Sequence, residues 1–116
     1  MISYEEFKKV EVRAGKILSA EKIPDTDKLL KLSVDFNEKD EQGNPKPRQI
    51  VSGISLYFPD PAVLVGKTCM FVTNLEPRTI KGYESNGMLF AVSSPADGAF
   101  SILEPGPGIP PGTLAA

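Results

Sequence analysis

Residues 29–36 read LLKLSVDF, and from Leu30 onward apolar and polar side chains alternate. Successive side chains of a β-strand point to opposite faces of the sheet, so this alternation predicts a strand that is buried on one face only. The predicted buried face consists of Leu30, Leu32, Val34 and Phe36. The stretch therefore predicts a sheet that packs one face into a core.

The segment before this strand shows the same period with one interruption. Apolar residues recur at every second position from Val10 to Ala14, the phase is broken at Gly15, and it resumes at Leu18. A glycine inside a strand predicts a β-bulge or a sharp bend. The polar stretch KIPDTDK at residues 22–28 predicts a turn that joins the two strands.

Three further strands are predicted downstream. They are RQIVSGI at residues 48–54, TCMFVTNL at 68–75 and MLFAVSS at 88–94. A polar loop with Gly and Pro at residues 37–47 makes the first of them the partner of the strand at 29–36 in a long hairpin. Between the strands at 48–54 and 68–75, the run AVLVG predicts a short helix or turn that ends at Gly66.

Both ends of the chain carry short elements. Ser3 followed by Glu6 has the spacing of a capping box and predicts a helix from Ser3 to about Lys9. After a turn at residues 97–98 and a strand-like FSIL, the chain ends in a tail rich in Pro and Gly. Such a tail cannot pair as a central strand, so we expect it to wrap the surface of the domain or a partner subunit.

These elements together predict the fold class. An all-β chain with five short strands, an early glycine bend and a small helix between the third and fourth strands is typical of a five-stranded Greek-key barrel of the oligonucleotide/oligosaccharide-binding (OB) type. A five-stranded barrel of the SH3 type is the alternative, and the helix before the fourth strand argues against it. We expect residues 1–116 to form a single domain.

Composition excludes several classes of function. There is no histidine, and the single cysteine, Cys69, lies in an apolar run and is expected to be a buried strand residue. Carboxylates such as those at residues 25, 27, 38 and 40 lack a convergent base or nucleophile, so we expect no catalytic residues, no metal site and no cofactor. No apolar run approaches the length of a membrane span or a signal sequence, which predicts a cytoplasmic protein.

The stretch NLEPRTIKGYESNGM at residues 74–88 has almost nothing to contribute to a core. Its two cations, Arg78 and Lys81, are suited to phosphate contacts. Ser85 and Asn86 can hydrogen-bond to backbone oxygens or a 2′-hydroxyl, and Met88 offers a polarizable surface for a base or sugar. Because the net charge of the chain is −2, binding of a nucleic acid would depend on such a local patch.

Several separated blocks of the sequence resemble one known family in the same order. The blocks are EVRAGKILSAEKIPDTDKLLKLSVDF, RQIVSGI, LVGKTCMFVTNLEPRTIKGYESNGM and ILEPGPGIPPGT. They resemble the tRNA-binding module of methionyl-tRNA synthetases, of small free-standing tRNA-binding proteins and of synthetase-associated cytokine-like proteins. The resemblance covers about residues 7–114 and implies an OB-type barrel, often a homodimer, that grips the outside of tRNA and has no chemistry of its own.

The resemblance also implies which residues face the RNA. The residues that match the family's RNA-facing turn and loop are Lys28, Arg78, Lys81, Ser85, Asn86 and Met88, with Lys31 as a weaker candidate. Several of these residues are equally compatible with a structural role. Lys28 and Lys31 alternate with leucines and fit the solvated face of a strand, the arginine could pair with Glu76 or Glu84, and the methionine could pack in the core.

The sequence is compatible with three functions. The first is a tRNA-binding module, free-standing or joined to a methionyl-tRNA synthetase, with tRNA, the synthetase and a second copy of the chain as partners. The second is a peptide-binding, chaperone-like homodimer of the same fold. An enzyme is the third and least supported. The acidic residues near Arg78 and the overall charge predict weak, salt-sensitive binding, and the loop at 37–47 carries cations at Lys39, Lys46 and Arg48 but also acidic Asp40 and Glu41.

Overall fold

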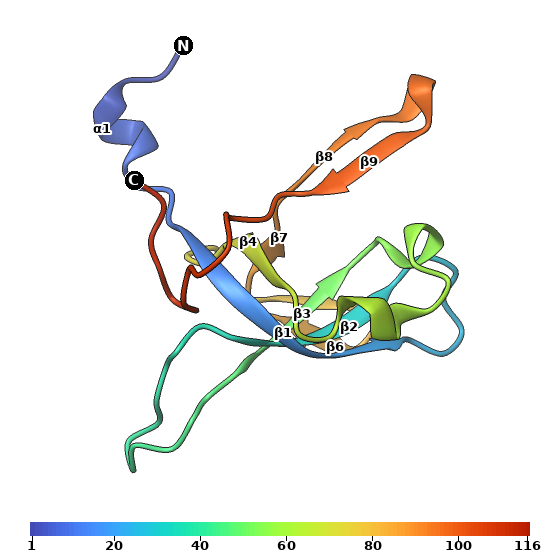
Figure 1. Cartoon of the computed structure of the whole chain (residues 1–116), viewed down its shortest axis with the longest axis horizontal. Coiled ribbons are helices and arrows are strands. Elements are labelled where there is room, and N and C mark those ends of the chain that lie inside the picture. Colours follow the sequence, from blue (N-terminus) through green and yellow to red (C-terminus); the bar gives the residue numbers. More distant parts are fainter.

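A five-stranded antiparallel sheet, curved into a nearly closed barrel, forms the centre of the molecule (Figure 1). The structure, a computed structural model, describes residues 1–116. Along the sheet the strand order is β3-β2-β1-β4-β7. These strands are β1 (Val12–Lys22), β2 (Leu30–Asp35), β3 (Arg48–Ser52), β4 (Thr68–Val72) and β7 (Met88–Leu89). The predicted all-β barrel of five strands is confirmed.

Two small hairpins and a few short helices complete the chain. One hairpin consists of β5 (Arg78–Ile80) and β6 (Tyr83–Ser85), and the other of β8 (Ala91–Ser94) and β9 (Ala99–Ile102). The first hairpin lies within the stretch 74–88, which sequence analysis treated as a loop. The helices are α1 (Tyr4–Phe7) and the 3-10 turns η1 (Ser55–Tyr57), η2 (Pro61–Leu64) and η3 (Pro95–Asp97).

The helix α1 begins as its sequence predicts and ends earlier. Ser3 caps it through its hydroxyl, which accepts from the Glu6 N–H at 3.1 Å, and the Glu6 carboxylate accepts from the Ser3 N–H. The helix ends at Phe7 instead of about Lys9, and none of its residues is buried. A single turn of helix has little stability in water on its own and usually depends on packing against the rest of the protein. The helix α1 has no such packing within the chain, because none of its residues is buried.

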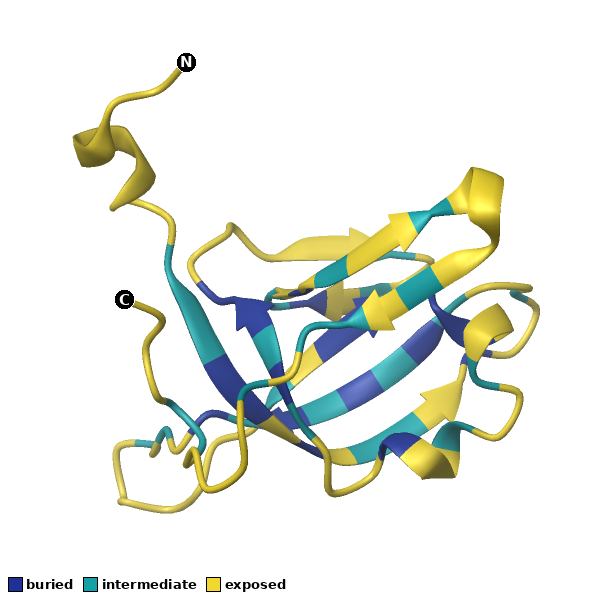
Figure 2. Cartoon of the chain, turned by 45° about the horizontal axis from the view of Figure 1, so that its top comes forward, coloured by how far each residue is buried: buried dark blue, intermediate teal, exposed yellow.

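The core follows the alternation of β2. Its apolar positions are buried, its polar positions are half-buried, and the pattern repeats through the whole strand (Figure 2). Phe36, just after β2, packs edge-on against Phe71 of β4 with ring centroids 5.4 Å apart. The other members of the core cluster are Ile17, Leu30, Leu32, Val34, Ile50, Ile54, Leu64, Cys69 and Leu89.

The irregularity of β1 lies at Leu18 and not at Gly15. Ile17 pairs with Val34 whereas Ser19 pairs with Ser33, so Leu18 is the extra residue of a bulge. As a result Ile17 is buried and Leu18 is 45% exposed, which reverses the phase expected from the sequence. The prediction of a glycine bend was therefore wrong in position.

Gly15 has a different role. A Cβ atom at this position would lie 2.6 Å from Val34 Cγ1 and 2.5 Å from Phe36 Cε1. These distances are far below van der Waals contact, so the absence of a side chain at residue 15 lets the side chains of β2 pack directly onto the β1 backbone. The glycine serves close packing in the core and not backbone freedom.

The barrel closes between β3 and the short segment that links β6 to β7. The Asn86 N–H donates to the Gln49 carbonyl at 2.8 Å, and the Val51 N–H donates to the Ser85 hydroxyl at 2.9 Å. Gly87 has φ of +140°, and a Cβ there would lie 2.9 Å from Ile50 Cδ1. We call this contact between β3 and residues 83–87 the β3–β6 seam.

The C-terminal tail pairs with the barrel's own first strand. The Ala14 N–H donates to the Thr113 carbonyl at 2.9 Å, and the Gly112 N–H donates to the Ala14 carbonyl at 2.7 Å. The tail occupies this place because β2 pairs with β1 only from Lys16 onward and leaves its beginning free. The tail was expected to wrap the surface of the domain or a partner subunit. In the structure it lies on its own domain, where a few of its residues pair with the edge of β1.

Replacing Gly15 by alanine should destabilise the protein. The new methyl group collides with buried side chains that cannot all move aside, so we expect a loss of about 1–3 kcal/mol in the free energy of unfolding. Urea unfolding followed by circular dichroism measures this. The matched control is Gly53→Ala, where no atom lies within 4 Å of the new methyl group. Equal midpoints for the two variants would contradict the packing role of Gly15.

Candidate nucleic-acid interface

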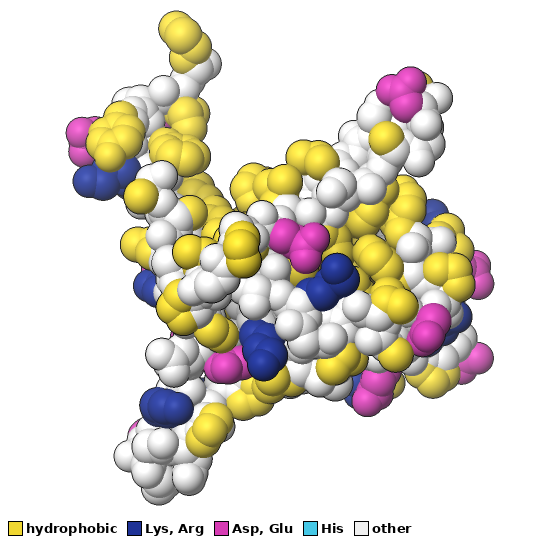
Figure 3. Space-filling view, in the orientation of Figure 1, with side chains coloured by type: hydrophobic (Ala, Val, Ile, Leu, Met, Phe, Trp, Pro, Cys, Tyr) yellow, Lys and Arg dark blue, Asp and Glu magenta, His cyan; other side chains and the backbone are white.

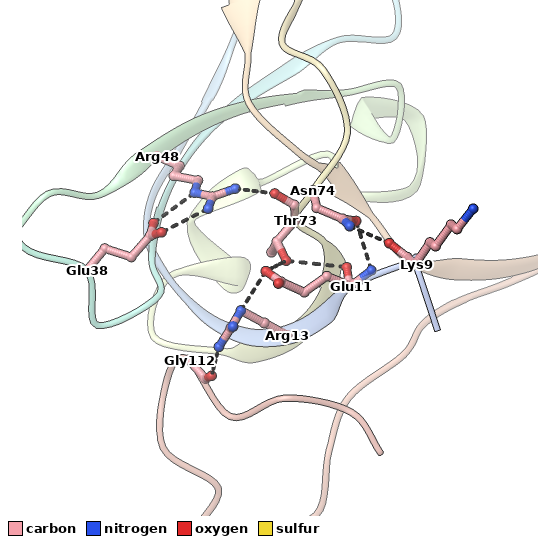
Figure 4. A network of polar contacts seen from close by, with 8 residues as sticks. All are labelled: Lys9, Glu11, Arg13, Glu38, Arg48, Thr73, Asn74 and Gly112. Atoms are coloured by element: carbon pink, nitrogen blue, oxygen red, sulfur yellow. Dashed lines mark hydrogen bonds and ion pairs between the residues drawn. The ribbon is translucent and has the colours of Figure 1, made fainter. Parts of the chain in front are cut away.

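The beginning of the stretch 74–88 is fixed by a polar network at one end of the barrel (Figure 4). The side-chain oxygen of Asn74 accepts from the Glu11 N–H at 2.8 Å, and its amide nitrogen donates to the Lys9 carbonyl. The neighbouring Thr73 hydroxyl donates to the Glu11 carboxylate at 2.8 Å. The loop therefore leaves the barrel from a rigid base that is tied to the first strand.

Two arginines of this network are bound to groups within the chain. Arg13 donates to the Glu11 carboxylate at 2.7 Å and to the carbonyl of Gly112 in the tail at 2.8 Å. Arg48 forms a bidentate pair with the Glu38 carboxylate, both bonds measuring 2.8 Å, and its third nitrogen donates to the carbonyl of Thr73. Both guanidinium groups hold parts of the fold together and are not free cations.

The ion pairs of the network shift the titration of its carboxylates. The Arg48 guanidinium, by hydrogen bonding, holds the pKa of Glu38 below its usual value of 4.5. Hydrogen bonds from Arg13 and then Thr73 lower the pKa of Glu11 in the same way. A carboxyl group with a lowered pKa in the folded state adds stability above its unfolded pKa, and that stability is lost as the pH falls through the folded pKa.

The cations that sequence analysis assigned to RNA lie outside this network. Arg78, Lys81 and Lys28 are exposed, and none takes part in the four ion pairs of the structure. The expected alternative in which Arg78 pairs with Glu76 or Glu84 is therefore not observed. Lys31 forms a long ion pair with Glu21, with Nζ 3.6 Å from the carboxylate, a surface contact of little strength.

Lys31 connects the strand β2 to the β5–β6 hairpin. Its Nζ lies 5.4 Å from the centroid of the Tyr83 ring, in the range of a cation–π contact. Tyr83 was not singled out from the sequence, although an aromatic ring among cations in a polar loop is a recognised signal of nucleic-acid binding. The Tyr83 ring is half-buried and contacts the Lys31 ammonium group from the hairpin.

The path of the hairpin brings Lys81 and Lys28 to the same end of the β3–β6 seam. Ser85 bonds to Val51 and Asn86 to Gln49, so the hairpin runs antiparallel to β3, and its turn points toward the end of β3. Lys28 lies at that end too, because its carbonyl accepts from the Ser55 N–H, just beyond β3, at 2.9 Å. The register thus brings Lys28 and Lys81 to the same end of the seam.

Lys81 occupies a backbone conformation that its side chain does not favour. It has φ of 51° and Gly82 has φ of 85°, and together they form the two-residue turn between Ile80 and Tyr83. Asn, Asp and Gly are the usual residues at the first position of such a type I′ turn, because other side chains are strained in the left-handed region. Lys81 therefore occupies this turn at a cost in backbone stability.

The remaining predicted residues differ in availability. Ser85 is buried, and its hydroxyl accepts from the Val51 N–H and donates to the Gly87 carbonyl, so it closes the barrel and has no group left for RNA. Met88 is 47% exposed on β7, so it is not a core residue. The side-chain amide of Asn86 makes no hydrogen bond within the chain and is partly exposed. The structure thus leaves Asn86 and Met88 available as contact groups and assigns Ser85 to the scaffold.

The single cysteine of the chain is buried. Burial raises the pKa of the Cys69 thiol to about 11, which keeps it protonated. No three His, Cys, Asp or Glu residues gather where they could hold a metal ion. None of the helices is long and apolar enough to cross a membrane. The surface around the β3–β6 seam carries exposed cations at one end and the free amide of Asn86 at the other.

Comparison with known proteins gives the class to which this barrel belongs. Residues 12–114 match the family described as "Putative tRNA binding domain". The chain belongs to this tRNA-binding domain family. The resemblance found in the sequence is thereby confirmed.

Similar proteins fall into two groups. The chain is 48% identical over 113 residues to the methionine–tRNA ligase of Methanoregula boonei, a match that covers 97% of this chain and 15% of that protein. The structure resembles that of a MetRS related protein from Pyrococcus horikoshii with a TM-score of 0.85 and 37% identity, over 100% of this chain and 98% of that one. It also resembles the CsaA chaperone protein of Picrophilus torridus with a TM-score of 0.81 and 26% identity, over the full length of both chains.

Stability should fall in acid because the network loses its carboxylates. Below the usual carboxyl pKa of 4.5, protonation of Glu38 breaks its bidentate pair with Arg48, so we expect the unfolding midpoint to drop steeply there. The variant Glu38→Gln should be less stable at neutral pH and should depend less on pH. Thermal unfolding between about pH 3 and 7 measures both effects.

The control for this pH series is Glu41→Gln. Glu41 is an exposed carboxylate that forms no ion pair or hydrogen bond in the structure. Its variant should show the same acid dependence as the wild type. An unchanged pH profile in Glu38→Gln would contradict the role of the network.

Proposed function

We propose that this chain is a non-catalytic module that binds tRNA through its sugar–phosphate backbone. The observation that carries the proposal is the group of cations at one end of the β3–β6 seam, where Lys28 and Lys81 lie near the end of β3 and Lys31 contacts Tyr83 of the hairpin. Arg78 stands at the base of the same hairpin, opposite Ser85. Unpaired cations gathered in this way suit the phosphates of an RNA strand, and the partly exposed Asn86 suits a ribose hydroxyl or base edge.

Binding of this kind is weak and depends on salt. The net charge of −2 gives no long-range attraction to RNA, so the affinity rests on a few local contacts. Each lysine or arginine that neutralises a phosphate releases condensed counterions, and that release makes the affinity fall as salt rises. Such a module is suited to assist a partner that supplies the specificity.

The partner we propose is a methionyl-tRNA synthetase. The chain spans 15% of the methionine–tRNA ligases it resembles, so it corresponds to a small part of those proteins. Either as part of such a synthetase or as a separate subunit, the module would raise the local concentration of tRNA near the catalytic part. This role places it in the cytoplasm.

We also propose that two copies associate through the apolar face around α1. Tyr4 and Phe7 of this single-turn helix are 70% and 59% exposed. Together with Leu114 of the tail they line a groove of about 340 Å³. Figures 1 and 3 show α1 and the β8–β9 hairpin projecting from the same side of the barrel, with hydrophobic side chains on and between them.

A second copy of the chain suits this face because the groove beside α1 is mostly apolar. Neighbouring exposed apolar side chains, such as Tyr4, Phe7 and Leu114, often mark a protein–protein contact. A helix without buried residues gains its stability from whatever covers it. Twofold association would cover both projections at once. It would also double the number of phosphate contacts available to one tRNA.

The substitution Phe7→Asp should separate the two copies. It places a charge in the proposed contact, so sedimentation at micromolar concentration should change from a dimer to a monomer of 12.5 kDa. The control is Leu56→Asp, an equally drastic change at a residue of η1 that is 66% exposed. The control should remain a dimer, and a wild-type monomer at this concentration would contradict the proposal.

Peptide binding is the second candidate function. Its support is the likeness to CsaA chaperone proteins from Picrophilus torridus and Bacillus anthracis, whose TM-scores are 0.81 and 0.79. The apolar groove beside α1 would be the site for an unfolded segment if a second copy did not cover it. A competition assay tests whether tRNA and peptide use different sites. An unfolded polypeptide that binds at the groove would not displace tRNA from the seam.

The tRNA proposal is tested by a salt titration of binding. The double variant Arg78→Gln/Lys81→Asn removes two phosphate contacts, so the slope of log K against log salt should fall by about 1.4 to 1.8. Its melting temperature should not fall, because asparagine suits the left-handed position of Lys81. Binding would therefore decrease without loss of the fold.

The matched control removes the same charge elsewhere. Lys16 and Lys67 lie together at the junction of β1 and β4, away from the β3–β6 seam. The variant Lys16→Ala/Lys67→Ala should keep the wild-type slope. Absence of any complex between the wild-type protein and tRNA at low salt would overturn the proposed function.

A further inference from the structure

The long loop between β2 and β3 builds a polar groove beside the proposed interface. The groove has a volume of about 480 Å³ and no hydrophobic residue in its lining. One wall is the base of the loop, at Lys39 and Lys46, and the other is the β3–β6 seam, at Gln49, Glu84 and Asn86. It lies at the beginning of β3, and the lysines of the proposed interface lie at the end of the same strand.

The loop is an ordered arm. Lys39 and Pro45 form an isolated antiparallel bridge, and the Lys46 N–H donates to the Glu38 carbonyl at 2.9 Å. At its base, the bidentate pair between Glu38 and Arg48 ties the arm to the barrel. The groove wall is thus held in place before any ligand binds, which lowers the entropy cost of binding.

Acidic and basic residues are mixed along the sequence of the arm, but the fold places them at different positions. The Asp40 carboxylate accepts from the N–H groups of Gln42 and Asn44, both at 2.9 Å, so it forms the turn at the tip. Neither Asp40 nor Glu41 lines the groove. Asp40 and Glu41 therefore lie at the tip of the arm, whereas its lysines and the paired Glu38 lie at its base.

The lining of the groove favours an anion. Lys39 and Lys46 form no ion pair, whereas Glu38 is neutralised by Arg48. Glu84 is the one carboxylate of the lining that has no cationic partner. Two free ammonium groups against one free carboxylate leave the groove positive within a chain that is acidic overall.

The groove also offers polar groups that do not bind each other. The Asn86 amide makes no hydrogen bond within the chain. Gln49 donates to the Glu84 carbonyl at 3.0 Å and leaves its own side-chain oxygen free. A ribose carries a 2′-hydroxyl that both donates and accepts, so a free amide and a free carbonyl oxygen match it, next to ammonium groups that match a phosphate.

We propose that this groove is a second subsite for the same RNA strand and seats a ribose–phosphate unit, with Lys39 and Lys46 on the phosphate and Asn86 and Gln49 on the sugar. The inference rests on the proposed tRNA-binding function. Strand β3 is five residues long, so the groove and the lysines at the far end of the seam are separated by about 15 Å. One strand that follows the seam would contact both places, and the arm would lengthen the footprint of the module.

The variant Lys39→Ala/Lys46→Ala tests the subsite. It removes two phosphate contacts, so the slope of log K against log salt for tRNA binding should fall by about 1.4 to 1.8. Both side chains are exposed and support no packing, so the melting temperature should stay at the wild-type value. Lys16→Ala/Lys67→Ala, with the same change in charge, should keep the wild-type slope.

A second variant changes the groove in the opposite direction. Glu84→Gln removes the unpaired carboxylate and should tighten tRNA binding. Glu41→Gln removes one negative charge at the tip of the arm and should leave binding unchanged, since Glu41 does not line the groove. Equal gains from both would mean that only the overall charge matters and would overturn the subsite.

The sugar contact is tested with the Asn86→Ala variant and a hairpin made once of RNA and once of DNA. The wild type should prefer RNA, and the variant should lose part of that preference. If Lys39→Ala/Lys46→Ala leaves the slope unchanged while Arg78→Gln/Lys81→Asn lowers it, the subsite is disproved and the proposed function stands. If the wild type binds no tRNA at all, the proposed function itself fails.

Discussion

Closure of the barrel along β3 is the constraint on which the rest of the structure depends. The edge of β3 would otherwise expose unpaired backbone groups, and the segment 85–87 satisfies them through the Asn86 N–H and the Ser85 hydroxyl. This closure requires a glycine at residue 87, because a Cβ there would meet Ile50. The same contact sets the path of the β5–β6 hairpin and therefore the place where its cations stand.

The distribution of charge explains how a mildly acidic chain can present a cationic edge. Arg13 pairs with the Glu11 carboxylate and bonds to the C-terminal tail at Gly112. Arg48, at the start of β3, pairs with the Glu38 carboxylate and bonds to Thr73, just after β4. Lysines along the seam have no such partners or only weak ones. Ion pairs thus use Arg13 and Arg48 for structure and leave Arg78, Lys28 and Lys81 exposed to solvent.

Two kinds of surface serve the two proposed partners. The seam is polar, carries unpaired lysines and amides, and suits RNA. The region around α1 and the tail is apolar and suits a second copy. Since the tail pairs with β1 and Arg13 bonds to Gly112, the apolar face is built on the same network that anchors the beginning of the stretch that we propose to face RNA.

The sequence by itself determined the first four barrel strands, the cap of α1, the core face of β2 and the set of cations, because alternation and capping depend on neighbours within a few residues. It did not predict the β5–β6 hairpin, and the single strand expected at residues 88–94 is divided into β7 and β8, which lie in different sheets. Only the tertiary structure decided the rest. The bulge at Leu18, the packing role of Gly15 and the structural use of Ser85 each depend on residues distant in sequence. The tail's pairing and the charge sorting of the loop arm depend equally on long-range contacts, and no local pattern encodes which backbone groups remain free for the tail to bind.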